Sequence, residues 1–137
     1  MSEHFNDYEL RCRGCPTGDY CKEDGIFLNV DPEARNMLNQ LRERLNKPLL
    51  INSASRCPSH NLRVGGKPHS KHLATPELAS TAFDISCDER RYAIYNLDAP
   101  TIEEVIHAAI EVGFNGIGRY SNFVHVDKRP EKARWTG

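Results

Sequence analysis

Two histidines and one aspartate occupy positions where a metal ion would satisfy them. His72 lies in a segment rich in Gly, Pro and Ser, whereas Asp84 and His125 each stand between apolar residues of a strand-like run. A buried carboxylate or imidazole is costly unless a hydrogen bond, an opposite charge or a metal ion satisfies it. Two histidines and one carboxylate form the tripod of catalytic zinc, whose fourth position stays open for water. Zn²⁺ lowers the pKa of such a water to about 7 and polarises a bound carbonyl, so this set could hydrolyse an amide.

Each of these residues taken alone could also be a hydrogen-bonded structural group. The remaining histidines outside the loop, His4 and His107, are expected at the surface because one lies near the N-terminus and the other at the edge of a helix. Two polar residues on separate apolar strands, with a histidine-rich loop leading into one of them, favour the metal interpretation.

A helix and a strand precede the histidine-rich segment. Residues 31–47, DPEARNMLNQLRERLNK, predict an amphipathic helix, because Asp31 can cap it, Pro32 fits the first turn and leucines follow at helical spacing. The run KPLLINSAS, residues 47–55, predicts a strand of the core.

Residues 56–79 are dense in Pro, Gly, Ser and His and predict a long loop with one helical turn near PSHNLRV. Loops of this length are uncommon inside compact domains and are often functional. The following run STAFDIS, residues 80–86, predicts the strand that carries Asp84.

A second helix and a hairpin follow. Thr101 and Glu104 can form a capping box at the start of TIEEVIHAAIEVGF, and Gly113 can end that helix. The runs NGIGRY and NFVHVDK predict two strands, and alternation in the second puts Phe123, His125 and Asp127 on one face.

This order of elements predicts a single α+β domain over residues 1–137, with a small, mainly antiparallel sheet packed by helices. Residues 1–30 show no clear period and predict an irregular N-terminal wrap.

The charge balance excludes a general attraction to polyanions. The chain has 18 Lys and Arg against 19 Asp and Glu, a net charge of -1, so we expect no nucleic-acid partner. Apolar runs are only a few residues long, so we expect no membrane insertion, and a monomer is favoured. The N-terminus has no apolar signal segment, so we expect synthesis in the cytoplasm.

Five segments resemble a known family in order and wording: INSASRCPSHN, VGGKPHSKHL, STAFDIS, GFNGIGRY and FVHVDKR. Together they make residues 4–135 similar to the VanY-like zinc D-Ala-D-Ala carboxypeptidases and murein endopeptidases, which share the hedgehog/DD-peptidase fold. The resemblance implies Zn²⁺ as cofactor and a peptidoglycan peptide as partner. It also implies that His72, Asp84 and His125 are the zinc ligands.

The chain departs from the family pattern between the first two ligands. They stand seven residues apart in the family motif and twelve apart here, so a loop of about the length of ATPEL is inserted. The loop must bulge between the ligands. If the insertion shifts the register, His69 would replace His72 as ligand.

The resemblance assigns Arg56 to binding a substrate carbonyl or carboxylate and to stabilising the developing oxyanion, a role that suits guanidinium. It places four further residues in the substrate cleft: Asn61, His69, Ser70 and Tyr120.

The general base is the weakest part of the match. Relatives carry an acid or base at the positions of Asn122 or Phe123, neither of which can take a proton from water. Asp127 is the nearest carboxylate and is the predicted base, with Glu77 in the inserted loop as a second candidate. Asp127 could instead support His125 or pair with Arg129.

The cysteines allow two arrangements. Cys12, Cys15, Cys21 and Cys57 could bind a structural zinc, or Cys12 and Cys57 could form a disulfide or a close thiol pair. Cys87 is expected as a small core residue, and Trp135 is expected to close the core.

The sequence therefore predicts a zinc peptidase acting on peptidoglycan stem peptides, either a D,D-carboxypeptidase or a murein endopeptidase. A substrate outside the cytoplasm and no export signal favour a phage lysis or tail protein. The alternative is a non-catalytic, zinc-containing module of the same fold that binds cell wall or a protein partner.

Overall fold

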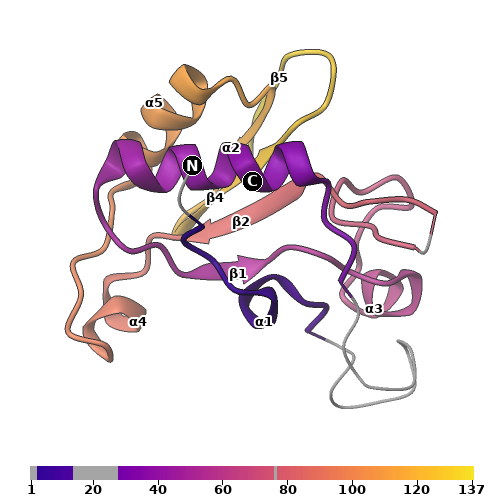
Figure 1. Cartoon of the computed structure of the whole chain (residues 1–137), viewed down its shortest axis with the longest axis horizontal. Helices are drawn as coiled ribbons and strands as arrows, with labels where there is room; N and C mark the ends of the chain where they lie inside the picture. Colours follow the sequence, from indigo (N-terminus) through magenta and orange to yellow (C-terminus); the bar gives the residue numbers. More distant parts are fainter. Residues whose placement is uncertain (1–2, 14–27, 76) are drawn as a thin grey trace.

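A five-stranded sheet carries the residues that the sequence singles out (Figure 1). The computed structural model describes residues 3–13, 28–75 and 77–137. The strands follow the order β1-β2-β4-β3-β5, and neighbours are antiparallel except for the parallel pair β3 and β5. This confirms the predicted α+β fold with a small, mainly antiparallel sheet. The strand bounds are Ile51–Ser53 (β1), Ala82–Ser86 (β2), Gly116–Arg119 (β3), Phe123–Asp127 (β4) and Ala133–Thr136 (β5).

Two long helices close the core on one face of the sheet. Helix α2 (Pro32–Leu45) packs on α5 (Ile102–Val112), and α5 contacts β3 and β4. Each buried aliphatic or aromatic side chain contributes about 1.5–3 kcal/mol by leaving water. Strand register is fixed in this way, because a slip of one residue would turn the apolar set to the other face. The buried strand residues in this core are Ile51, Phe83, Ile85, Ile117, Val124 and Val126.

Both long helices begin as the sequence predicts. The Asp31 side chain accepts a hydrogen bond from a first-turn N–H of α2, and Thr101 and Glu104 form a capping box at the start of α5. Gly113 ends α5 with φ 108°, a left-handed conformation that favours glycine. Nζ of Lys128 lies 2.7 Å from Asp31, so this cap also ties α2 to the segment after β4.

Short elements account for the differences from the prediction. Within the expected irregular wrap, a capping box at Asn6 holds a four-residue helix, α1 (Asp7–Leu10). Helix α4 (Glu89–Ala93) and strand β5 were not expected, because runs of four or five residues show too little periodicity. The predicted helical turn in the long loop is confirmed as α3 (Pro58–Arg63).

The other face of the sheet carries polar side chains and glycines. The register sets Asp84 of β2 opposite His125 of β4, and His125 opposite Gly118 of β3. Gly118 in turn lies beside Trp135 of β5. The alternation in β4 puts His125 and Asp127 on this face and its two valines in the core, as predicted. One row across the sheet therefore joins the predicted ligands to the C-terminal strand.

Candidate metal centre

Three side chains from one loop and two strands converge at a single point. Oδ1 of Asp84 lies 3.0 Å from Nε2 of His72 and 3.0 Å from Nδ1 of His125. The three ligand atoms lie within 4.8 Å of one another. Atoms bound to one zinc ion at about 2.0 Å and near-tetrahedral angles are about 3.3 Å apart. The group therefore has the size and the donor set of a metal site, and His72, Asp84 and His125 are brought together as predicted.

The outer nitrogen of His72 faces a backbone acceptor. Nδ1 lies 2.7 Å from the carbonyl oxygen of Ala54, which can only accept, so Nδ1 carries the proton and donates it. In the neutral ring the lone pair is then on Nε2, which faces Asp84. Burial lowers the pKa of His72, although the neighbouring Asp84 opposes this effect, so the neutral ring is favoured.

His125 repeats this arrangement on the other side of Asp84. Nε2 lies 2.7 Å from Oδ2 of Asp127, a carboxylate that accepts, so Nε2–H donates and Nδ1 faces Asp84. Burial lowers the pKa of His125, but hydrogen bonds from its ring to Asp127 and Asp84 outweigh burial and raise it. The raised pKa favours the imidazolium, in which Nδ1–H donates to Asp84. Loss of that proton, as when a metal ion takes its place, turns a lone pair of His125 toward the same carboxylate oxygen that the inner nitrogen of His72 faces.

Asp84 is an ionised carboxylate at the centre of the group. Its side chain is 13% exposed, against 2% for His72 and 11% for His125, so the site opens on the side of Asp84 and His125. Burial by itself raises the pKa of Asp84, but the two adjacent imidazoles hold it well below its usual range. The negative charge is therefore available to a cation at neutral pH.

Backbone hydrogen bonds hold His72 despite the inserted loop. The N–H of Arg56 donates to the carbonyl of His72 (2.8 Å), and the N–H of Ala74 donates to the carbonyl of Arg56 (2.8 Å). The insertion then closes on itself, because the N–H of Thr75 donates to the carbonyl of Leu78 (2.9 Å). The bulge is therefore a turn outside the site. His69 is exposed and lies outside the group, so the register shift that would bring it into the group does not occur.

Asp127 is fully buried behind His125, on the far side of the imidazole from Asp84. Arg129 donates to both of its oxygens, from Nε to Oδ1 (2.8 Å) and from Nη2 to Oδ2 (2.7 Å). Burial raises the pKa of Asp127, but these donors outweigh it and hold the pKa well below its usual range. This placement favours the alternative role, in which Asp127 orients His125 and pairs with Arg129, over that of a base facing the metal site. Glu77, the second candidate base, is exposed and lies outside the group.

Arg56 and Asn61 form a fixed pair near the site. Nη1 of Arg56 donates to Oδ1 of Asn61 (3.1 Å), and Nε donates to Oγ of Ser53 (3.3 Å). Burial lowers the pKa of the Arg56 guanidinium, and the negative charge of Asp84 opposes that shift. Arg56 stays charged at neutral pH because the ordinary value is so high. Ser70 has a local role, since its hydroxyl accepts a hydrogen bond from the N–H of His72 (3.2 Å).

Comparison with known proteins agrees with this geometry. Residues 4–127 match the model of the Peptidase M15 family. The chain belongs to that family. Membership implies a zinc-dependent peptidase acting on peptidoglycan, and it confirms the resemblance seen in the sequence. A comparison with curated proteins gave no match. Among the described residues of this M15 peptidase, no helix is long and apolar enough to cross a membrane.

The prediction that Trp135 closes the core of the M15 domain is wrong. Trp135 is half-buried on the sheet face that carries the metal group, and its ring centroid lies 5.1 Å from that of His125. Its indole Nε1–H donates to the hydroxyl of Tyr120 (3.0 Å). The sequence gives little signal for this placement, because it depends on the pairing of β5 with β3.

The cysteines of the described segments lie outside the metal group. Cys12 and Cys57 are both buried as neighbouring thiols, and the N–H of Cys57 donates to Sγ of Cys12 (3.4 Å). This fits the predicted thiol pair. The four-cysteine zinc site stays a prediction, since Cys15 and Cys21 lie outside the described residues. Cys87 packs against the core, and burial raises its pKa to about 11.

Proposed function

We propose that this M15 peptidase binds Zn²⁺ through Nε2 of His72, a carboxylate oxygen of Asp84 and Nδ1 of His125, and that it hydrolyses peptidoglycan stem peptides as a D,D-carboxypeptidase or murein endopeptidase. The observation that carries the proposal is the orientation of the two rings. Each directs its outer nitrogen to a fixed acceptor and its inner nitrogen to the same oxygen of Asp84. In the neutral rings that leaves two lone pairs facing a negative charge, an arrangement that a cation between them stabilises.

The bound metal would supply Lewis-acid chemistry, polarising a carbonyl and lowering the pKa of water. The chain's own residues would do the positioning. Arg56, already aligned by Asn61, would donate to a substrate carbonyl or carboxylate oxygen and stabilise the negative charge that develops there. Tyr120, in the same region, would line the cleft beside His125.

Two observations favour the second candidate function, a non-catalytic zinc module that binds cell wall or a partner. Asn122 and Phe123 stand where relatives carry an acid or base, and Phe123 is stacked on Tyr120 with centroids 4.3 Å apart. Asp127 is buried behind His125, away from Asp84. Activity on the wall therefore has to be measured separately from zinc binding.

The test is metal content by mass spectrometry, followed by digestion of purified peptidoglycan. We expect about one zinc ion per wild-type chain, lost in His72→Ala, Asp84→Ala and His125→Ala. His107→Ala, an exposed histidine on α5, is the matched control and should keep its zinc. A metal-free wild type, purified without chelators, would overturn the site.

Zinc-loaded protein should release peptide products from the wall, and the three ligand variants should not. A zinc-loaded chain that releases none would decide for the non-catalytic module. The masses of the products would distinguish loss of a terminal D-Ala from cleavage of a cross-link.

A further inference from the structure

Trp135 lies in the same row of the sheet as the proposed metal ligands. Its register partner is Gly118, which in turn lies opposite His125. The indole reaches across the glycine, and its ring centroid is 5.1 Å from the His125 ring at an interplanar angle of 51°. A side chain on Gly118 would overlap the indole around Nε1, so the glycine is what lets the two rings meet.

Several contacts fix the indole in this position. Nε1–H donates to the hydroxyl of Tyr120 (3.0 Å), and the Tyr120 ring is itself stacked on Phe123 at an interplanar angle of 7°. The guanidinium of Arg129 lies over the indole at 5.0 Å from its centroid. An aromatic ring held this firmly can bind a ligand with little loss of conformational freedom.

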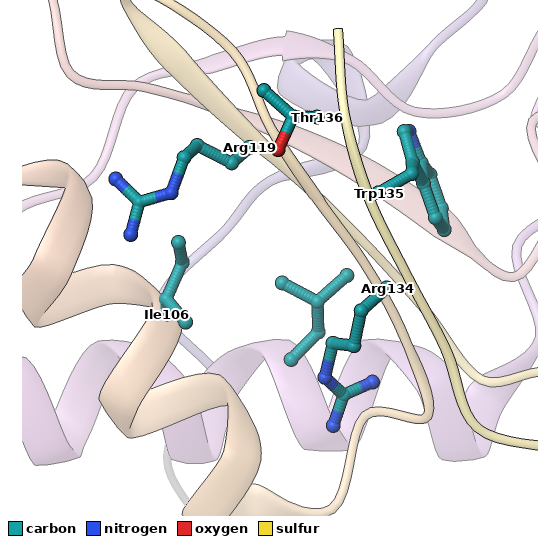
Figure 2. A pocket seen from close by; sticks show the side chains of 6 residues that line it. Ile106, Arg119, Arg134, Trp135 and Thr136 are labelled. Atoms are coloured by element: carbon teal, nitrogen blue, oxygen red, sulfur yellow. The ribbon is translucent and has the colours of Figure 1, made fainter.

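The indole lies on the sheet face that carries the metal group. Trp135 is half-buried, and the adjacent His125 and Asp84 are the ligands through which the metal group opens. Figure 2 shows the indole on the other side of the β5 ribbon from Arg119 and Ile106. Those two residues line a hollow of about 270 Å³ together with Ile117, Arg134, Thr136 and Trp135 itself, so the indole also borders this hollow. The indole therefore lies between this hollow and the metal group, and its contact with the His125 ring is on the side of the metal group.

We propose that Trp135 is a specificity-determining residue. Its indole forms an apolar wall that contacts the aliphatic side chain of the substrate residue on the carbonyl side of the cleaved amide bond. This inference rests on the proposed function. A carbonyl directed at the metal group places the side chain of its own residue a few ångströms away, and the indole is the aromatic surface at that distance from His125. An apolar wall distinguishes a methyl group from none by about 10–200-fold in kcat/KM.

The selectivity test uses two stem peptides that differ in one residue, the one on the carbonyl side of the cleaved bond. This residue is alanine in one peptide and glycine in the other. The wild type should prefer alanine by at least about tenfold. Trp135→Ala should lose most of that preference while keeping its zinc, and Trp135→Phe should retain it. Arg134→Ala, on the same strand but the opposite face, is the control. A purely structural role for Trp135 would lower both rates together, and an unchanged ratio would overturn the inference.

A second readout does not depend on turnover. Trp135 is the only tryptophan of the chain, so intrinsic fluorescence reports on this position alone. Titration of the zinc-loaded protein with a stem pentapeptide ending in D-Ala-D-Ala should change the emission saturably. The midpoint should match the dissociation constant from calorimetry. Peptide binding without an emission change, or no peptide binding, would overturn the inference that Trp135 contacts the substrate. Binding with an emission change but no product would count against catalysis only.

Discussion

Oδ2 of Asp127 lies 2.7 Å from Nε2 of His125, opposite the ring nitrogen that faces Asp84. This carboxylate fixes which nitrogen of His125 carries the proton and therefore which one is free for a metal. Its other contacts, to Arg129, keep it in place. The role of Asp127 is thus testable through metal affinity rather than through proton transfer.

Asp127→Asn should weaken zinc binding by about 10–100-fold, because the amide is a poorer acceptor for Nε2–H and leaves Arg129 without its charged partner. Competition with a chromogenic zinc chelator would measure the change. Glu77→Gln, which neutralises the exposed carboxylate of the inserted turn, should bind zinc like the wild type. Equal zinc affinity in Asp127→Asn and the wild type would contradict the role of Asp127 in orienting His125.

Gly116→Ala should disturb the contact between Asp127 and His125, because Gly116 is the register partner of Asp127. A Cβ at Gly116 would overlap the carboxylate of Asp127. That carboxylate is fully buried, so it cannot move aside into solvent. We expect a loss of about 1–3 kcal/mol in the free energy of unfolding of the metal-free protein, together with weaker zinc binding. Urea titration monitored by circular dichroism would give the first quantity.

Gly65→Ala separates local strain from an effect on the site. Gly65 has φ 75° and nothing near its would-be Cβ, so alanine there costs backbone strain alone. Its stability should fall while its zinc affinity stays at the wild-type value. If Gly116→Ala behaved in the same way, the contact with Asp127 would be irrelevant to the site.

Zinc should stabilise the folded chain. A ligand that binds only the native state at 100 times its Kd adds about 2.7 kcal/mol to the free energy of unfolding, so the Tm should rise with added zinc and fall with chelator. Asp84→Asn keeps the size of the central side chain but loses its charge, and its Tm should not respond to zinc. A wild-type Tm that changes with neither zinc nor chelator would contradict the proposed site.

Arg56→Lys should lower kcat/KM by about 10²–10³-fold without loss of zinc, since lysine cannot reproduce the donors that Asn61 and Ser53 align. Steady-state kinetics of stem-peptide hydrolysis would measure this loss of kcat/KM. An Arg56→Lys enzyme with wild-type kinetics would remove Arg56 from the substrate site.

Asp31 should make stability depend on pH in the acid range. Burial raises its pKa, but the ion pair with Lys128 and the hydrogen bonds at the start of α2 outweigh burial and lower it. A lowered native pKa means that the contribution is complete above the ordinary value of about 3.9 and is lost as the pH falls through the native value. Asp31→Ser keeps the cap and removes the charge, so it should be less stable by about 0.5–1 kcal/mol at pH 6 and by progressively less below pH 4. A difference independent of pH would show that the ion pair contributes nothing.

The sequence predicts the two long helices, four of the five strands and the grouping of His72, Asp84 and His125. The helices and strands depend on local patterns, namely caps and periodicity. The ligand group depends on polar residues placed inside apolar strands, for Asp84 and His125, and on the resemblance to the family, which also assigns His72. The side of His125 on which Asp127 lies was not predictable, because alternation gives the face of the strand but not the rotation of a ring. Trp135 was misplaced for a different reason. Its position depends on the parallel pairing of β5 with β3, which four residues of sequence do not reveal.

The turn closed by Thr75 and Leu78 separates two properties that sequence motifs usually combine. A motif specifies how many residues lie between two ligands, whereas the site requires only that their backbones be anchored on either side. Here the pairing of His72 with Arg56 and of Asp84 with His125 provides those anchors. The chain between them can therefore change in length during evolution, or accept an inserted epitope or affinity label in the laboratory, without altering the distances within the group.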